Sequence, residues 1–230
     1  RSEELCYFIM EFVDGTDLRQ VIRTGNLTPE QALAIVPQIC EALQYAHEEG
    51  FVHRDIKPEN IFIDKKGRVK IGDFGLAKIL NRPATDFTLT QPQQRMGTPH
   101  YMAPEQIEGS SNVDHRADIY SLGVVFYEIL TGELPLGRFD LPSQKVHVDV
   151  RLDEVVLHSL EKEPNRRYQQ VSEVKTDIEA IGVAAVPDNP AEKPPPAASS
   201  REKHSATFED ELEQACQRVR IPAIGLVVTG

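Results

Sequence analysis

A short polar run in the first third of the chain has the residue types that reaction chemistry needs. The run is Phe51-Val52-His53-Arg54-Asp55-Ile56-Lys57-Pro58-Glu59-Asn60, and Asp73-Phe74-Gly75 follows it closely. Unpaired charges are costly to bury, so a core segment would not concentrate carboxylates, an amide and two cations in this way. A solvated loop would not interleave them with the apolar residues at positions 51, 52, 56 and 61–63. The pattern therefore predicts a polar cluster held on an apolar platform, as in a reaction site.

Length and composition limit the class of protein. The chain has 230 residues, a formal net charge of −11, 40% hydrophobic residues and 27% charged residues. These fractions are ordinary for a soluble globular protein, and the acidic balance argues against a general nucleic-acid binder, which would carry a basic face. Cys6, Cys40 and Cys216 lie far apart and lack metal-ligand spacing, which favours reduced thiols in a cytosolic compartment.

The elements before the polar run can be predicted from local patterns. Leu5–Met10 is short, apolar and rich in β-formers, which indicates a buried strand. Asp14-Gly15 is a turn signal, and Thr16 is predicted to cap a short helix over residues 17–23. Thr28-Pro29-Glu30-Gln31 then has the features of a helix start. The apolar stripe after it predicts a largely buried helix that ends at Gly50. The proline at position 37 should cause either a kink or the local loss of one hydrogen bond.

After the polar run, two β-forming stretches predict a hairpin. Ile61–Ile63 and Arg68–Ile71 flank the turn residues Asp64–Gly67. This hairpin would place Asn60 and Asp73 at its two outer ends. Residues 78–106 lack periodicity and predict a long loop, residues 114–130 predict a central buried helix, and two more helices are expected at 152–162 and 171–181.

Three motifs in series resemble the protein kinase family. They are His53-Arg54-Asp55 with Asn60 five residues on, Asp73-Phe74-Gly75, and Ala103-Pro104-Glu105, in the order and with the intervals of that family. The resemblance covers about residues 5–181. It implies an α+β fold that is mainly the helical C-lobe of a kinase, with the last strand and the hinge of the N-lobe.

The resemblance implies a role for each polar residue, and the residue types suit these roles. Phosphoryl transfer needs a carboxylate near the attacking hydroxyl and cations on the phosphates. Asp55 is implied as the base, and Lys57 as the cation that stabilises charge on the γ-phosphate of ATP. Asn60 and Asp73 are implied as ligands of Mg²⁺, which prefers carboxylate and amide oxygens. A salt-linked structural loop is the alternative, and it does not account for three motifs in order.

The start of the chain resembles the hinge that binds ATP. The residues implied to contact the nucleotide there are Met10 at the gatekeeper position, Glu11 and Val13 at the adenine, and Asp17 at the ribose. Phe62 and Leu18 would sandwich the adenine ring, although the sequence leaves a plain core position open for both.

The sequences Asp-Ile-Lys-Pro-Glu-Asn at 55–60 and Gly97–Glu105 resemble the serine/threonine branch of the family rather than the tyrosine branch. The implied partners are therefore protein substrates with serine or threonine hydroxyls (EC 2.7.11.1 type). Arg54 beside the base implies control by phosphorylation or autophosphorylation, because a phosphate on the following loop could pair with it. The candidates are Thr85, Thr88 and Thr90, each of which has an ordinary loop hydroxyl as its alternative.

Two groups of buried charged residues are expected to stabilise the fold rather than to take part in the reaction. Asp118 lies in the most apolar helix and needs partners there, and the resemblance supplies them in the backbone near His53 and Arg54. Glu105 and Arg167 are expected to form an ion pair beneath the substrate loop.

Parts of the kinase pattern are missing from this sequence. The Gly-rich loop, the strand lysine and its glutamate partner would precede Leu5, so we expect residues 1–182 to be a partial kinase domain with weak or absent ATP turnover alone. Residues 183–207, rich in Pro and Ala, are expected to be a disordered linker. Residues 208–230 are expected to form a juxtamembrane helix and either the start of a membrane span or a buried or incidental apolar end. Gly137–Ser143 and the apolar end of the chain together resemble a bacterial receptor-type kinase. In such a kinase the catalytic domain would be cytoplasmic.

Three functions are compatible with this sequence pattern. The first is an ATP- and Mg²⁺-dependent serine/threonine protein kinase. The second is a catalytically silent kinase-like module that binds partners; intact residues at positions 55, 57, 60 and 73 count against it. The third is a small-molecule phosphotransferase that shares the fold. The loop of such enzymes lacks the Lys-Pro-Glu-Asn form and the Ala-Pro-Glu segment, and this chain has both, which counts against the third function.

Overall fold

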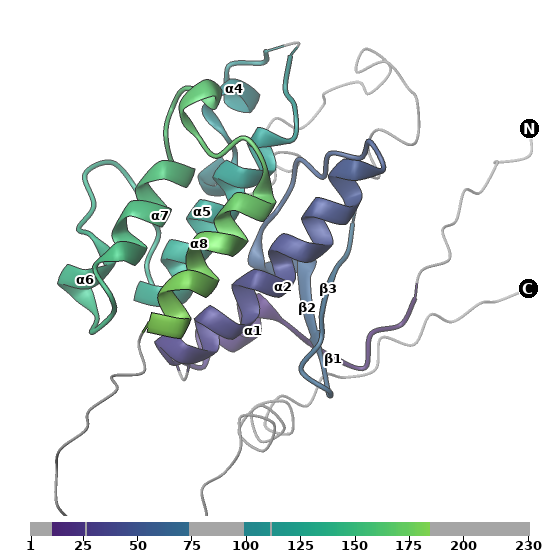
Figure 1. Cartoon of the computed structure of the whole chain (residues 1–230). Helices are drawn as coiled ribbons and strands as arrows, with labels where there is room; N and C mark the ends of the chain where they lie inside the picture. Colours follow the sequence, from purple (N-terminus) through teal and green to yellow (C-terminus); the bar gives the residue numbers. More distant parts are fainter. Residues whose placement is uncertain (1–10, 26, 74–98, 111, 185–230) are drawn as a thin grey trace, which may run out of the picture.

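The computed structural model describes residues 11–25, 27–73, 99–110 and 112–184, with a small sheet beside a larger group of helices (Figure 1). The strands are β1 (Gly15–Asp17), β2 (Ile61–Asp64) and β3 (Val69–Ile71). The α-helices are α1 (Leu18–Arg23), α2 (Pro29–Glu48), α4 (Pro104–Ile107), α5 (Arg116–Thr131), α6 (Pro142–Lys145), α7 (Arg151–Ser159) and α8 (Val171–Ala184). Three short 3₁₀ helices are η1 (Pro58–Asn60), η2 (Pro99–Tyr101) and η3 (Pro164–Arg166). This mixture confirms the predicted α+β class.

The sheet has three antiparallel strands in the order β1-β2-β3. The predicted hairpin is confirmed as β2 and β3, with Ile61 opposite Ile71 and Phe62 opposite Lys70. The prediction of a turn at Asp14-Gly15 is wrong, because Gly15 begins β1 and pairs with β2. A side chain at Gly15 would place its Cβ 2.0 Å from the carbonyl oxygen of Ile63, so the close pairing of β1 and β2 requires glycine here.

Helix α1 has a different cap from the one that the sequence predicted. Thr16 lies within β1, and Asp17 is the N-cap, accepting a hydrogen bond from the backbone N–H of Gln20 at 2.9 Å. Both residues are good caps, and the pairing of β1 with β2 decides between them because it keeps Asp17 extended as well, so that the helix begins only at Leu18.

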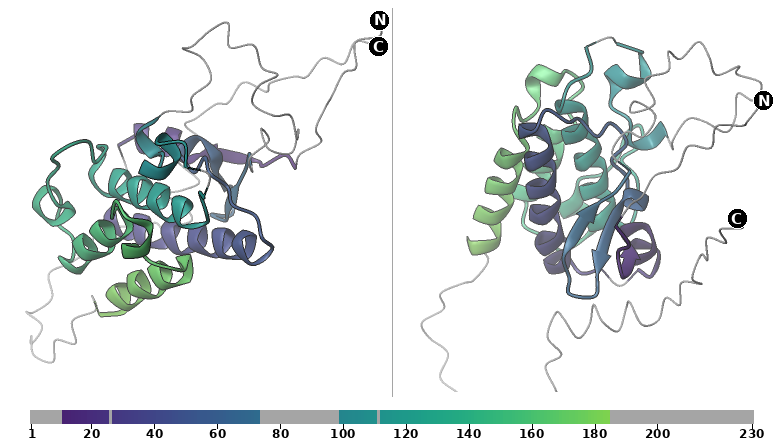
Figure 2. Two further views of the ribbon diagram at one scale, coloured as in Figure 1. Left: turned by 90° about the horizontal axis from the view of Figure 1, so that it is seen from above. Right: turned by 90° about the vertical axis from the view of Figure 1, so that its right-hand side faces the viewer.

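Helix α2 begins as predicted, with a capping box. The Thr28 hydroxyl accepts from the N–H of Gln31, and the Gln31 side chain accepts from the N–H of Thr28. The helix continues through Pro37 and packs against α5, α8 and β3. Gln38 joins it to the hairpin, since its amide oxygen accepts from the N–H of Val69 at 3.2 Å. Figure 2 shows α2 between α8 and the sheet.

Helix α5 is the central buried helix, as predicted, although it begins at Arg116 rather than at Asp114. Thirteen of its residues are buried, and it packs against α2 and α7. Gly132 ends it with a φ of +75°, a left-handed conformation that glycine adopts without strain. The predicted helices after it are also present, but α7 ends at Ser159 and not near Lys162.

Several predictions lie outside the described residues. These concern the strand at 5–10 with Met10, the Phe-Gly pair at 74–75, the threonines Thr85, Thr88 and Thr90, and the linker and apolar end after residue 184. The predicted loop at 78–106 is wrong for its last part, which forms η2 and α4. Within the described part of the chain, no helix is both long enough and apolar enough to cross a membrane.

Candidate functional site

Three polar side chains of the 53–60 loop, which comprises His53 to Asn60, meet at one carboxylate. The Lys57 ammonium donates to Oδ2 of Asp55 at 2.6 Å. The side-chain amide of Asn60 donates to the same oxygen at 3.2 Å and to the Asp55 carbonyl at 2.8 Å. The Asp55 side chain keeps 40% of its surface exposed, whereas that of Lys57 keeps 18%. The carboxylate is therefore oriented by two donors and still open to solvent.

The apolar platform beneath this cluster is real but smaller than the sequence predicted. Ile56, Ile61 and Ile63 are fully or almost fully buried. Phe51 is a correction, because its side chain is 64% exposed. It follows Gly50, whose φ of +78° turns the chain out of α2 and away from the core.

Two non-glycine residues at this site adopt left-handed backbone conformations. Arg54 has a φ of +67° and Asp73 a φ of +57°. Such conformations cost about 1–3 kcal/mol each and persist only where the surrounding contacts hold them. They lie on either side of the reaction cluster, directly before Asp55 and directly after the hairpin.

His53 links the 53–60 loop to the end of the hairpin. Its Nε2 lies 2.8 Å from the carbonyl oxygen of Gly72, and its Nδ1 lies 3.2 Å from the N–H of Asp55. A carbonyl only accepts and an N–H only donates, so these partners assign the donor role to Nε2 and the acceptor role to Nδ1. The N–H of Gly72 in turn donates to the carbonyl of Asn60 at 2.9 Å. These bonds hold Asp73 near the loop that carries Asp55 and Asn60.

Asp118 anchors the loop from below, as predicted. Its side chain is completely buried in α5. One oxygen accepts from the N–H of His53 at 2.8 Å and from Nε2 of His47 at 2.9 Å, and the other accepts from the N–H of Arg54 at 2.6 Å. Every partner points at the charge, so this buried carboxylate is satisfied. His47, at the end of α2, was not foreseen from the sequence.

The backbone carbonyl and the side chain of Arg54 are each held by a hydrogen bond. Its carbonyl accepts from the side-chain amide of Gln106 at 2.8 Å, and its guanidinium donates to the carbonyl of Val113 at 2.9 Å. Its Nε is buried and has no hydrogen-bond partner among the described residues. Gln106 also accepts from the N–H of Ala103 at 3.0 Å, which ties α4 to the loop. No local pattern in the sequence predicts this contact of Gln106.

A second polar network borders the loop at Glu59. The Arg19 guanidinium donates to Glu59 at 2.9 Å and to Glu128 at 2.5 Å, and it also bonds the Tyr101 hydroxyl. That hydroxyl donates to the second oxygen of Glu128 at 2.6 Å. Burial and the bond to Glu128 raise the pKa of Tyr101. Helix α1, η1, η2 and α5 are thus joined by one connected set of hydrogen bonds.

The predicted ion pair of Glu105 and Arg167 is confirmed. Two parallel hydrogen bonds of 2.7 Å join the carboxylate to the guanidinium, which is completely buried. Burial opposes ionisation of Glu105, but the bonds from Arg167 outweigh it and hold the pKa of Glu105 below its usual value. Arg167 also donates to the carbonyls at positions 116, 161 and 162.

The residues predicted to contact a nucleotide are placed around the start of the sheet. Phe62 lies opposite Asp17 in the pairing of β1 with β2. Its ring packs on Gly72, where a Cβ would lie 2.8 Å from a ring carbon. Both carboxylate oxygens of Asp17 already accept from Gln20, and Glu11 is ion-paired with Lys70. Val13 is half-buried.

Leu18 has no exposed surface. The structure therefore places Leu18 in the core, which was the alternative to a contact with adenine.

The donor set at Asn60 and Asp73 fits a hard divalent cation. The Asn60 nitrogen is used on Asp55, which leaves its amide oxygen as a ligand, and the exposed Asp73 carboxylate has no bond to another described residue. Among the described residues, no group of three or more His, Cys, Asp or Glu side chains is arranged so that it could hold a metal ion. That is compatible with Mg²⁺, which is bound through one or two carboxylates together with water and phosphate oxygens.

Comparison with known proteins decides which family has this arrangement. Residues 1–209 match the protein kinase domain family. The chain belongs to the protein kinase family. It is 41% identical over 202 residues to the bacterial serine/threonine-protein kinase PknB of Mycolicibacterium smegmatis, covering 81% of this chain and 32% of that protein. It is 38% identical over 203 residues to PknB of Mycobacterium tuberculosis, with the same coverage. The chain thus spans about a third of the length of these curated kinases.

Solved structures agree with the family. The kinase domain of Mycobacterium tuberculosis PknI has a TM-score of 0.59 and 29% identity, covering 74% of this chain and 64% of that chain. The resemblance to a Hanks-type bacterial serine/threonine kinase and the kinase-like fold are therefore confirmed. The structure brings Asp55, Lys57 and Asn60 together and links Asp73 to them through Gly72, while Met10 lies outside the described residues.

Proposed function

We propose that this kinase-family chain is part of an active serine/threonine protein kinase, which transfers the γ-phosphate of ATP to protein hydroxyls. The observation that supports it most is the hydrogen bonding of Asp55. Lys57 and Asn60 both donate to Oδ2, and Oδ1 has no partner among the described residues. A carboxylate with one oxygen fixed and the other open to solvent can accept a proton in a defined direction.

In the proposed reaction, Oδ1 of Asp55 removes the proton as the substrate hydroxyl attacks the γ-phosphorus and ADP leaves. Lys57 lies beside this carboxylate, and its ammonium can stabilise the negative charge that develops on the transferred phosphoryl group. Asn60 and Asp73 would hold Mg²⁺, which when bound neutralises charge on the phosphates. The residues at 11, 13, 17 and 62 are proposed to contact the adenosine.

The 230 residues alone are proposed to turn over ATP weakly or not at all. Their sequence contains no Gly-rich loop, strand lysine or paired glutamate in the expected pattern. The catalytic domain is proposed to be cytoplasmic and attached to a membrane through the region after residue 208. Wild-type-like activity of residues 1–230 would contradict the first proposal, and a longer protein that fractionates without membranes would contradict the second.

Control by phosphorylation is proposed at Thr85, Thr88 or Thr90. It is supported by Arg54, whose buried Nε has no hydrogen-bond partner among the described residues and lies directly before the proposed base. Mass spectrometry of the active protein should find phosphate on at least one of the three threonines. Its absence from all three in a fully active preparation would reject the proposal.

The test of the catalytic proposal is an assay of the full-length protein on itself and on a generic protein substrate, with ATP and Mg²⁺. Asp55→Asn should lower transfer by about 10²–10⁴-fold, because it removes the base. Glu49→Gln is the matched control, since it removes one negative charge from an exposed position at the end of α2. Nucleotide binding without transfer by the wild-type protein would instead favour a silent kinase-like module.

A further inference from the structure

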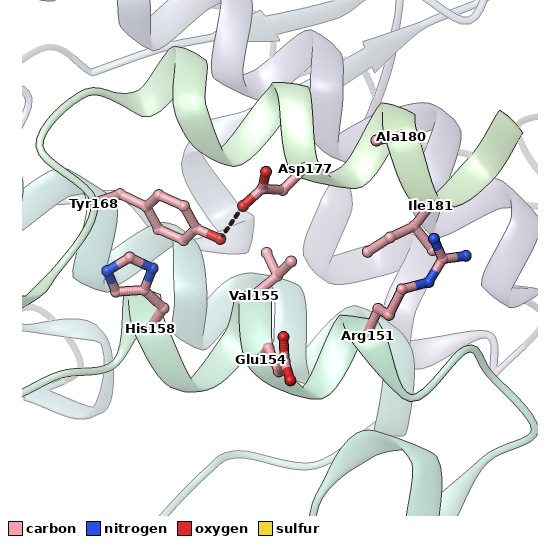
Figure 3. A pocket seen from close by; sticks show the side chains of 8 residues that line it. All are labelled: Arg151, Glu154, Val155, His158, Tyr168, Asp177, Ala180 and Ile181. Atoms are coloured by element: carbon pink, nitrogen blue, oxygen red, sulfur yellow. Dashed lines mark hydrogen bonds between the residues drawn. The ribbon is translucent and has the colours of Figure 1, made fainter. Parts of the chain in front are cut away.

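A groove between α7 and α8 lies apart from the proposed catalytic residues. It has a volume of about 370 Å³ and is lined by Arg151, Glu154, Val155, His158, Tyr168, Asp177, Ala180 and Ile181 (Figure 3). Its base is apolar, since Val155 and Ile181 are buried, and its rim carries exposed charged side chains. None of the residues assigned to phosphoryl transfer takes part in it.

The chemistry of the groove is ordered along its length. Figure 3 shows Arg151 and Ile181 at one end, Glu154 and Asp177 in the middle, and the rings of His158 and Tyr168 at the other end. The two ring centroids are 4.0 Å apart, and the Tyr168 hydroxyl donates to Asp177 at 2.7 Å. The Arg151 guanidinium uses Nε and one terminal nitrogen on Asp149, which leaves its other nitrogen available. The groove thus offers a cation, then two carboxylates, then the exposed ring of His158 beside the largely buried ring of Tyr168.

The chain that follows α8 carries complementary groups in the same order. Helix α8 ends at Ala184, one turn beyond Ile181 and so beside the Arg151 end of the groove. The sequence then contains the turn-forming residues Pro187-Asp188-Asn189-Pro190, followed by Glu192, Lys193 and Pro194-Pro195-Pro196. Lys193 is the one cation between positions 185 and 200.

We propose that residues 192–196 of this chain dock into the groove between α7 and α8, after a reversal of the chain at 187–190. Glu192 then meets Arg151, Lys193 lies between Glu154 and Asp177, and the three prolines pack on the rings of His158 and Tyr168. Proline-rich segments bind aromatic-lined grooves because their extended conformation is already formed.

The lengths agree with this placement. Residues 151 and 158 lie about 10 Å apart along α7 at the helical rise of 1.5 Å per residue. Residues 192 and 196 span about 12 Å in a polyproline conformation at 3.1 Å per residue. The seven residues from 185 to 191 are enough to reverse the direction of the chain. This inference is independent of the proposed kinase activity.

Carbodiimide coupling tests the docking, because it joins an ammonium to a carboxylate that touches it, forming an amide with the carboxylate oxygen lost to the reagent. In the 230-residue protein, Lys193 should couple to Glu154 or Asp177 at least tenfold more than Lys203 couples to either, as measured by peptide mass spectrometry. Lys193→Arg keeps the charge but cannot form the product. Exchange of the two charges, Glu154→Lys with Lys193→Glu, should restore a cross-link between the same positions.

Three results would overturn the proposal. One is equal coupling of Lys193 and Lys203, and another is failure of the exchanged pair to couple in a variant whose circular dichroism and thermal unfolding match those of the wild-type protein. The third concerns the occupant. If an equal mixture of ¹⁵N-labelled and unlabelled protein gives about half of its cross-linked product as mixed-label species, the segment comes from a second copy rather than from the same chain.

Discussion

Two aspartates contact the same loop in opposite environments. Asp118 is completely buried in α5 and accepts hydrogen bonds from His47, His53 and Arg54, so both of its oxygens are occupied. The side chain of Asp55 is 40% exposed, and its bonds from side chains reach one oxygen. Full satisfaction of a buried charge favours a single loop conformation, whereas an oxygen that is exposed and without a partner is available for reaction.

The first aspartate maintains the geometry of the second. Arg54, between His53 and Asp55, has a left-handed backbone whose cost must be met by its surroundings. Its N–H is bound by Asp118 and its carbonyl by Gln106. Asp118 therefore fixes the backbone direction from which the side chain of Asp55 extends. This predicts that stability and activity depend on different carboxylates, and the following variants test that separation.

Asp118→Ala should have the largest effect on stability. It leaves three N–H donors in or near the core without an acceptor, and each unsatisfied buried group costs about 1–3 kcal/mol. We expect a loss of about 4 kcal/mol or more in the free energy of unfolding, measured by urea denaturation. Glu108→Ala, at an exposed position ten residues earlier in the sequence, should change the value by less than about 0.5 kcal/mol. A cost for Asp118→Ala below about 1 kcal/mol would refute its role as the anchor.

Glu105→Gln should cost somewhat less, about 3 kcal/mol at neutral pH, because it leaves the buried Arg167 without its carboxylate. The effect should depend on pH in a defined direction. The pKa of Glu105 is lowered in the folded protein from an ordinary value of 4.5, so its contribution is complete above that value. It is lost as the pH falls through the lower folded-state pKa. Urea denaturation from pH 7 to pH 3 should show the wild type and the variant converging at acid pH, and a constant difference would contradict this.

Tyr101→Phe should have a moderate effect of about 1 kcal/mol, the usual net value of a hydrogen bond. The change removes the hydroxyl that donates to Glu128 at 2.6 Å and bonds Arg19, while the ring keeps its packing. Tyr45→Phe is the matched control, because that side chain is 69% exposed. Thermal unfolding of both variants should lower the midpoint only for Tyr101→Phe, and an equal shift in both would show that the network contributes nothing measurable.

The sequence predicts the frame of this molecule well where a local signal decides the structure. The capping box at Thr28, the hairpin and the glycine at 132 are each determined by neighbouring residues. The cap of α1 was predicted wrongly because Thr16 and Asp17 are both good caps, and the pairing of Asp17 with Phe62, 45 residues further along the chain, keeps Asp17 outside the helix. The prediction for Phe51 failed for a related reason, since hydrophobicity alone does not show which side of the chain faces the core.

The site was predictable to a different degree. The resemblance implied roles for Asp55, Lys57, Asn60 and Asp73, which stay predictions, and the anchoring role of Asp118, which its hydrogen bonds confirm. The contacts of His47, Gln106 and Arg19 could not be predicted, because each joins elements that lie far apart in the sequence. The left-handed conformation of Arg54 also lacks a sequence signal, whereas aspartate, as at position 73, is one of the non-glycine residues enriched in that region.

Asp55→Ala should have the smallest effect on stability, within about 0.5 kcal/mol, although the same position is proposed to determine activity. Lys57 would lose a partner, but a partly exposed ion pair contributes little and water can replace it. Asn60 would keep its bond of 2.8 Å to the backbone carbonyl of residue 55, which the substitution does not change. Urea denaturation measures the cost against Asp118→Ala. A loss above about 2 kcal/mol would mean that Asp55 also supports the fold, and the separation between a stabilising carboxylate and a reactive one would not hold.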